Sequence, residues 1–110
     1  MAIYIKFKPE EKNFDIHSAI REKIAGNEIR TWGCTNNQFS NRPKEWERSV
    51  WMRSTGKGED WIKYDIFPGD IDINPLTKTE YTITCGRFVE MLLTHFNEYI
   101  ENIKVESFKQ

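Results

Sequence analysis

Cysteine and histidine are scarce in this chain, with two residues of each among 110. Cys34 and Cys85 are too few for a disulfide framework, and nothing near them has the spacing of a zinc motif. We therefore expect free, inert thiols and a cytoplasmic location. A nucleophilic site needs a base and an orienting group in contact, and His17 and His95 leave few ways to build one. The sequence thus predicts a protein that is not an enzyme.

Long apolar runs are also missing. The N-terminal stretch of residues 1–8 alternates apolar and polar side chains, so it does not resemble a secretory signal. No tract approaches the roughly 20 apolar residues that span a bilayer. The net charge is only -1, so no global field attracts the protein to nucleic acid or to an anionic membrane. We expect no membrane association, and the overall charge disfavours nucleic acid.

Motifs for metals and cofactors are incomplete. Asp70, Asp72 and Asn74 begin like a calcium loop, but Pro75 stands where that loop needs glycine and Tyr81 where it needs glutamate. Residues 56–58, Gly-Lys-Gly, lack the second glycine and the hydroxyl residue of a phosphate-binding loop. We expect no metal and no cofactor, and we interpret these glycines as a flexible hairpin tip.

Aromatic residues, in contrast, are abundant, at 14% of the chain. Each buried ring removes roughly 150–250 Å² from water, so fifteen rings can build one core although the apolar share is only 38%. A chain of this length is expected to form one domain, residues 1–110.

Hydrophobic periodicity predicts the elements of the first half. Residues 2–8 alternate as a half-buried strand. A helix capped by Asn13 or Asp15 runs to about Ala25 and ends at residues 26–27, Gly-Asn. A short strand is expected at residues 28–33. Residues 35–43 are polar and turn-prone, which predicts a loop in which an exposed Phe39 would be notable.

The second half reads as hairpins followed by a helix. The predicted order is a helical turn at 44–47, a strand at 48–54, a hairpin loop at 55–60, strands at 61–67, 70–74 and 80–85, and a helix at 86–103. The whole is an α+β fold of order β-α-β-β-β-β-β-α. We expect a mainly antiparallel sheet of about five to six strands with two helices packed on one face.

The stretch from residue 46 to 67 combines rings with charges of both signs, which suits a contact surface as well as a core. One interpretation is a nucleic-acid-binding module in which Trp46, Arg48, Trp51 and Arg53 stack on bases and neutralise phosphates. A second alternative is a small enzyme with a site near His95. Self-association through a sheet edge is a further alternative.

Charge is divided unevenly along the chain, with a net of +4 over residues 1–58 and -5 over residues 59–110. We expect six carboxylates on consecutive strands and turns to form an acidic surface: Glu59, Asp60, Asp65, Asp70, Asp72 and Glu80. Such a surface complements a basic cleft. The leading hypothesis is therefore a non-enzymatic inhibitor, of the immunity-protein or antitoxin type, that occludes a basic enzyme or bacterial toxin domain. The predicted partner-binding residues are Glu59, Asp60, Trp61, Asp65, Asp70, Asp72 and Trp51.

Overall fold

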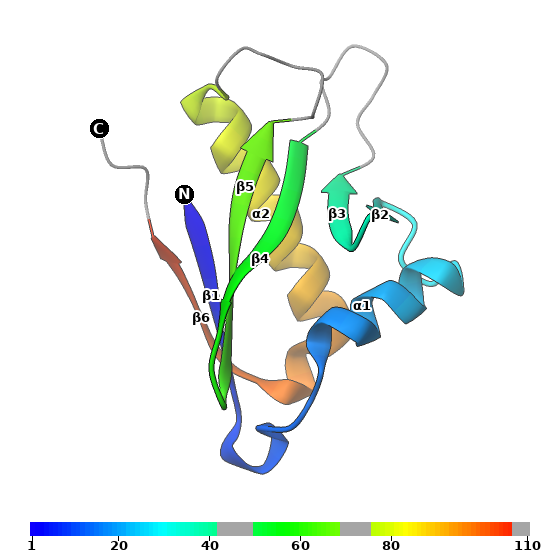
Figure 1. The fold of residues 1–110 in the computed structure, drawn as a ribbon, viewed down its shortest axis with the longest axis vertical. Helices are drawn as coiled ribbons and strands as arrows, with labels where there is room; N and C mark the ends of the chain where they lie inside the picture. The colour runs from blue at the N-terminus through cyan, green and yellow to red at the C-terminus, as the bar shows by residue number, and fades with distance from the viewer. Residues whose placement is uncertain (42–49, 69–75, 107–110) are drawn as a thin grey trace.

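The computed structural model describes residues 1–41, 50–68 and 76–106, and within them it is an α+β fold (Figure 1). The strands are β1 (Ala2–Phe7), β2 (Trp32–Thr35), β3 (Gln38–Asn41), β4 (Val50–Lys57), β5 (Trp61–Pro68) and β6 (Ile100–Glu106). The helices are α1 (Ile16–Ala25) and α2 (Lys78–Phe96), with 3₁₀ turns η1 (Pro9–Glu11) and η2 (Asn97–Tyr99). The expected helical turn at 44–47 and strand at 70–74 lie outside the described residues.

The described strands form one antiparallel sheet of order β2-β3-β4-β5-β1-β6. Because each neighbouring pair is antiparallel, β1 is parallel to β4 with β5 between them, and β5 is parallel to β6 with β1 between them. The connections through α1 and α2 are therefore two split β-α-β units. The β2–β3 hairpin, inserted after α1, extends the sheet beside β4. The predicted antiparallel α+β class is confirmed.

Local sequence explains the first elements as expected. The side chains of β1 alternate, with Ile3 and Ile5 fully buried. Asp15 caps α1, since its carboxylate accepts hydrogen bonds from the Ser18 backbone N–H at 3.1 Å and from the Ser18 hydroxyl at 2.9 Å. These bonds lower the pKa of Asp15. Asn27 follows the helix with a φ of 63°, a left-handed conformation that asparagine tolerates.

The predicted loop over residues 35–43 is wrong in its first part, because β2 and β3 form a hairpin there. Asn36 and Asn37 connect the strands with φ angles of 50° and 65°, as a two-residue turn of type I′ requires. Phe39 is fully buried rather than exposed. The strand expected at 28–33 begins only at Trp32. An Asn-Asn pair is typical of loops, but it also suits the tightest hairpin turn.

The predicted strand over residues 80–85 is also wrong, because these residues form the first turns of α2. Thr77 and Glu80 make a capping box: the Thr77 hydroxyl accepts from the Glu80 N–H at 3.1 Å, and the Glu80 carboxylate accepts from the Thr77 N–H at 2.8 Å. The alternation of Tyr81 and Ile83 suggested a strand, but Thr84, Cys85 and Phe88 continue the buried helical stripe.

The last described element is a strand, whereas the predicted order places a helix there, so the prediction is wrong at this point. α2 stops at Phe96, η2 follows, and β6 pairs with β1. The apolar residues Ile100 and Ile103 were assigned to the helical stripe, yet they belong to β6. Among the described strands, β6 lies at the edge of the sheet, with β1 as its one neighbour.

Both helices pack on one face of the sheet, and an aromatic cluster lies at the centre of this core. The Phe88 ring of α2 contacts Trp32 of β2 and Tyr64 of β5, with ring centroids 5.2 and 5.1 Å apart. Phe39 of β3 lies 6.1 Å from Tyr64. All four side chains are at most 1% exposed. The cluster joins the inserted hairpin to the split β-α-β units.

Gly86 lies in the interior of α2 and is exposed. A Cβ atom at this position would meet nothing within 4 Å. Because alanine restricts the unfolded chain and favours helix, we expect Gly86→Ala to raise the free energy of unfolding by about 0.5–1 kcal/mol. Urea denaturation of the two proteins would measure the difference. A destabilised variant would contradict the exposed placement of this residue.

Candidate functional site

The sheet face opposite the helices carries rings and charges of both signs, and we call it the open face. Its side chains alternate with the buried ones of β1, β4, β5 and β6. They are Tyr4, Lys6, Trp51, Arg53, Trp61, Lys63, Asp65, Phe67, Lys104 and Glu106. No helix of the described residues covers this face.

Contacts between these side chains order the open face. Lys63 Nζ lies 3.5 Å from the Asp65 carboxylate, which raises the pKa of Lys63, and it also lies 5.6 Å from the centre of the Tyr4 ring. The Arg53 guanidinium lies 4.7 Å from the centre of the Phe67 ring. Cations over ring faces are favourable and keep both partners in place. The surface is therefore partly preorganised.

Trp61 is the most exposed ring of the open face, at 38%. Its indole covers two glycines of the β4–β5 hairpin: a Cβ atom on Gly58 would lie 1.9 Å from the indole nitrogen, and one on Gly56 would lie 3.4 Å from the ring. The Tyr4 ring lies 6.4 Å away. The glycines that we interpreted as a flexible tip thus provide the backbone surface on which Trp61 rests.

The structure brings three of the seven predicted partner-binding residues onto one face. Trp51, Trp61 and Asp65 all belong to the open face, with Trp51 half-buried opposite Phe67. Glu59 and Asp60 lie in the adjoining β4–β5 turn. Asp70 and Asp72 lie outside the described residues, as do Trp46 and Arg48 of the alternative interface.

The acidic surface that we expected is not continuous among the described residues. Glu80 lies at the start of α2 and not on a strand, because it completes the capping box. Glu59 pairs with Lys12 at 3.3 Å, and Asp65 accepts a hydrogen bond from Thr55 in addition to its contact with Lys63. Four of the expected carboxylates are therefore distributed over a turn, a strand and a helix.

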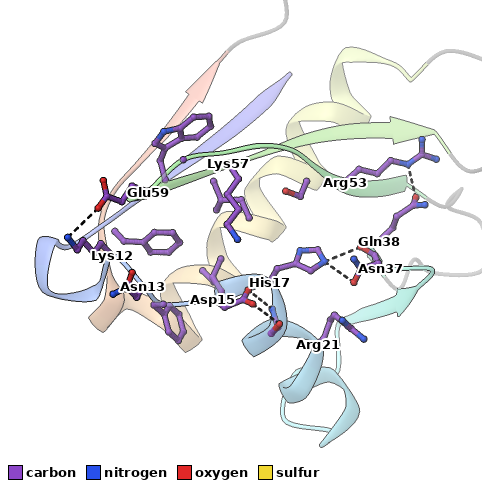
Figure 2. Close-up of a pocket in the computed structure, with 18 of the residues that line it drawn as sticks. Lys12, Asn13, Asp15, His17, Arg21, Asn37, Gln38, Arg53, Lys57 and Glu59 are labelled. Atoms are coloured by element: carbon purple, nitrogen blue, oxygen red, sulfur yellow. Dashed lines mark hydrogen bonds and ion pairs between the residues drawn. The ribbon is translucent and has the colours of Figure 1, made fainter.

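A cavity of about 780 Å³ adjoins the open face, between the start of α1, the β2–β3 turn and the β4–β5 hairpin (Figure 2). Apolar walls come from Phe7, Phe14, Ile16, Trp61 and Ile62. Its charged residues are Lys12, Arg21, Arg53, Lys57, Asp15 and Glu59, with His17 between them. Figure 2 shows Lys57 extending from the hairpin toward Asp15 and His17.

His17 joins three elements at the floor of this cavity. Its Nδ1 lies 2.7 Å from the Tyr64 hydroxyl, and its Nε2 lies 3.1 Å from the backbone carbonyl of Asn37. Burial raises the pKa of Tyr64, so the hydroxyl stays protonated. A carbonyl only accepts, so we assign the hydrogen to Nε2, and Nδ1 accepts from Tyr64. Both nitrogens of His17 have hydrogen-bond partners, so this side chain has a structural role in the described part of the chain.

His95 lines neither this cavity nor a smaller one of about 370 Å³ beside Tyr4 and Trp61. Cys85 is ten residues away on the same helix, roughly 15 Å at 1.5 Å per residue, so the two cannot form a pair. Burial raises the pKa of the Cys85 thiol, which lowers its reactivity. Within the described residues, no group of three or more His, Cys, Asp or Glu side chains could hold a metal ion.

Sequence reasoning missed the part that β1 and α1 play. Tyr4 and Lys6 enter the open face because they alternate with Ile3 and Ile5, a signal that the sequence contains. The convergence of Arg21 and Lys57 on one cavity depends on the return of the β4–β5 hairpin to α1, and no local pattern reveals it.

None of the described helices is both long enough and apolar enough to span a bilayer. Comparisons with protein-family models, with curated proteins and with solved structures find no match for this chain.

Proposed function

We propose that this chain is a non-enzymatic, cytoplasmic protein-binding domain that contacts its partner through the open face. The observation that carries the proposal is a sheet face that no described helix covers. On this face the rings of Trp51, Trp61 and Tyr4 lie beside basic and acidic side chains. Tryptophan, tyrosine and arginine are the residues that dominate protein interfaces energetically. Cys34 and Cys85 are free thiols, which supports the proposed cytoplasmic location, since the cytoplasm is a reducing compartment.

Within this class we propose an inhibitor that blocks the active site of another protein. A surface built on strands changes little on binding, which suits occlusion of a fixed cleft. Glu59 and Asp60 in the β4–β5 turn are the described carboxylates that a basic cleft would meet beside Trp61. The ordered cation–ring contacts keep the side chains of the face in place before the partner arrives.

Trp61→Ala tests the proposal. Removal of an exposed interface ring typically costs more than about 1 kcal/mol, so we expect at least about a fivefold loss of affinity for the partner. The wild-type protein and the variant would be used in parallel to capture partners from the native host, and the captured protein would be titrated with both. Leu93→Ala is the control, since Leu93 is 47% exposed on α2. Equal retention by Trp61→Ala would overturn the role of the open face.

A nucleic-acid-binding module is the second candidate, because the open face carries four Lys and Arg side chains against two carboxylates. Rings flanked by cations are typical of surfaces that bind single strands. A filter-binding titration with single-stranded RNA and DNA distinguishes the two candidates. Affinity that falls steeply with salt and is lost in Trp61→Ala would favour nucleic acid. No binding at low salt would exclude it.

A further inference from the structure

We propose that the cavity between α1 and the two hairpin turns binds a small ligand that carries a phosphate group, with Lys57 and Arg21 as the cationic contacts. The cavity adjoins the open face and shares Trp61 and Arg53 with it, but the proposal does not depend on the protein interface. A volume of about 780 Å³ lies within the range of small-molecule sites, which is roughly 300–1,000 Å³.

Within the described residues, some of the charged side chains that line the cavity have hydrogen-bond or ion-pair partners, and others do not. Both carboxylates are occupied: Asp15 accepts two hydrogen bonds from Ser18, and Glu59 pairs with Lys12. Arg53 is held by the Gln38 side chain at 2.6 Å. In contrast, Lys57 and Arg21 make no hydrogen bond or ion pair within the part of the chain that the structure describes.

Four cationic side chains against two carboxylates leave the lining positive by two charges in a chain of net charge -1. A phosphate monoester carries about -1.5 to -2 at neutral pH, which matches this excess better than a single carboxylate does. Arg21 lies one turn after His17, so the two share a face of α1. Lys57 extends from the β4–β5 hairpin toward Asp15 and His17 (Figure 2), and its positive charge also lowers the pKa of Asp15.

The remaining walls fit the rest of such a ligand. Phe14, Ile62 and the edge of Trp61 provide an apolar side, on which a ring or carbon chain can pack. On the far side, Asn36, Asn37 and Gln38 of the β2–β3 turn provide amide groups, which hydrogen-bond hydroxyls. His17 fixes this turn through Asn37, so the amide wall is held relative to α1.

Titration of the ¹⁵N-labelled full chain by NMR tests the proposal. The probes are AMP, glucose 6-phosphate, inorganic phosphate and a phosphoserine peptide, with adenosine and sodium chloride at equal ionic strength as references. We expect the free phosphate monoesters to shift the amide signals of Gly58, Asn37 and Ser18 in a saturable manner, and those of Leu93 and Thr94 to stay in place. Saturation by the peptide alone would assign the phosphate to a protein partner instead of a metabolite.

Lys57→Gln is expected to weaken AMP binding roughly tenfold, the loss of one charge-assisted contact. Lys78→Gln is the matched control, because it removes the same charge from the exposed start of α2. Three results would each overturn the proposal: equal binding of adenosine and AMP, equal effects of the two variants, or no saturable shift with any phosphate probe.

Discussion

Replacement of Phe88 by alanine is expected to lower the free energy of unfolding by about 3–5 kcal/mol. Phe88 is fully buried and packs edge-on against Trp32 at an interplanar angle of 73°. It also contacts Tyr64, so its removal leaves a cavity where α2, the inserted hairpin and β5 meet. Because domains of this size are stable by only about 5–15 kcal/mol, the loss is a large fraction of the total.

Urea denaturation followed by tryptophan fluorescence would measure this effect, with two variants of α2 as controls. Phe88→Leu retains most of the volume and should lose less than half as much as Phe88→Ala. Gly86→Ala, two residues before Phe88 in α2, should not lose any stability. If Phe88→Ala cost less than about 1 kcal/mol, the aromatic cluster would not be the centre of the core.

Residue patterns sufficed for β1, β5 and α1, because strand alternation and the Asp15 cap are local signals. They failed where one segment satisfied two patterns. The side chains of residues 80–85 alternate between apolar and polar as in a strand. The capping box of Thr77 and Glu80 is the local signal that indicates a helix instead. Likewise, Ile100 and Ile103 continue the helical stripe of α2 in register, but pairing with β1, which is distant in sequence, places them in β6.

The part of the candidate site that could be predicted from the sequence is the part in which each residue's face follows from alternation along its own strand. Trp51, Trp61 and Asp65 share a face because strand periodicity places them there. Glu80 completes the cap of α2 and does not belong to an acidic surface, and the sequence alone does not distinguish these two roles of a carboxylate. The cavity was not predictable from local patterns, since Arg21 in α1 and Lys57 at the end of β4 are separated in sequence by β2, β3 and the rest of β4.

His17→Leu is expected to lower the free energy of unfolding by about 1–3 kcal/mol. The leucine side chain would still cover the Tyr64 hydroxyl but could not accept its hydrogen bond. Tyr64 is fully buried, and within the described residues the only partner of its hydroxyl is His17 Nδ1, at 2.7 Å. Tyr64→Phe should cost less, about 1 kcal/mol, since the imidazole nitrogen left behind is only half-buried.

The double variant His17→Leu/Tyr64→Phe makes this prediction specific. When both partners are replaced by apolar groups, no buried hydroxyl remains unsatisfied, so the double variant should be more stable than His17→Leu alone. A double-mutant cycle from urea denaturation at pH 7.5 would yield the coupling energy between the two side chains. Additive losses would show that Tyr64 does not depend on His17 for its hydrogen bond.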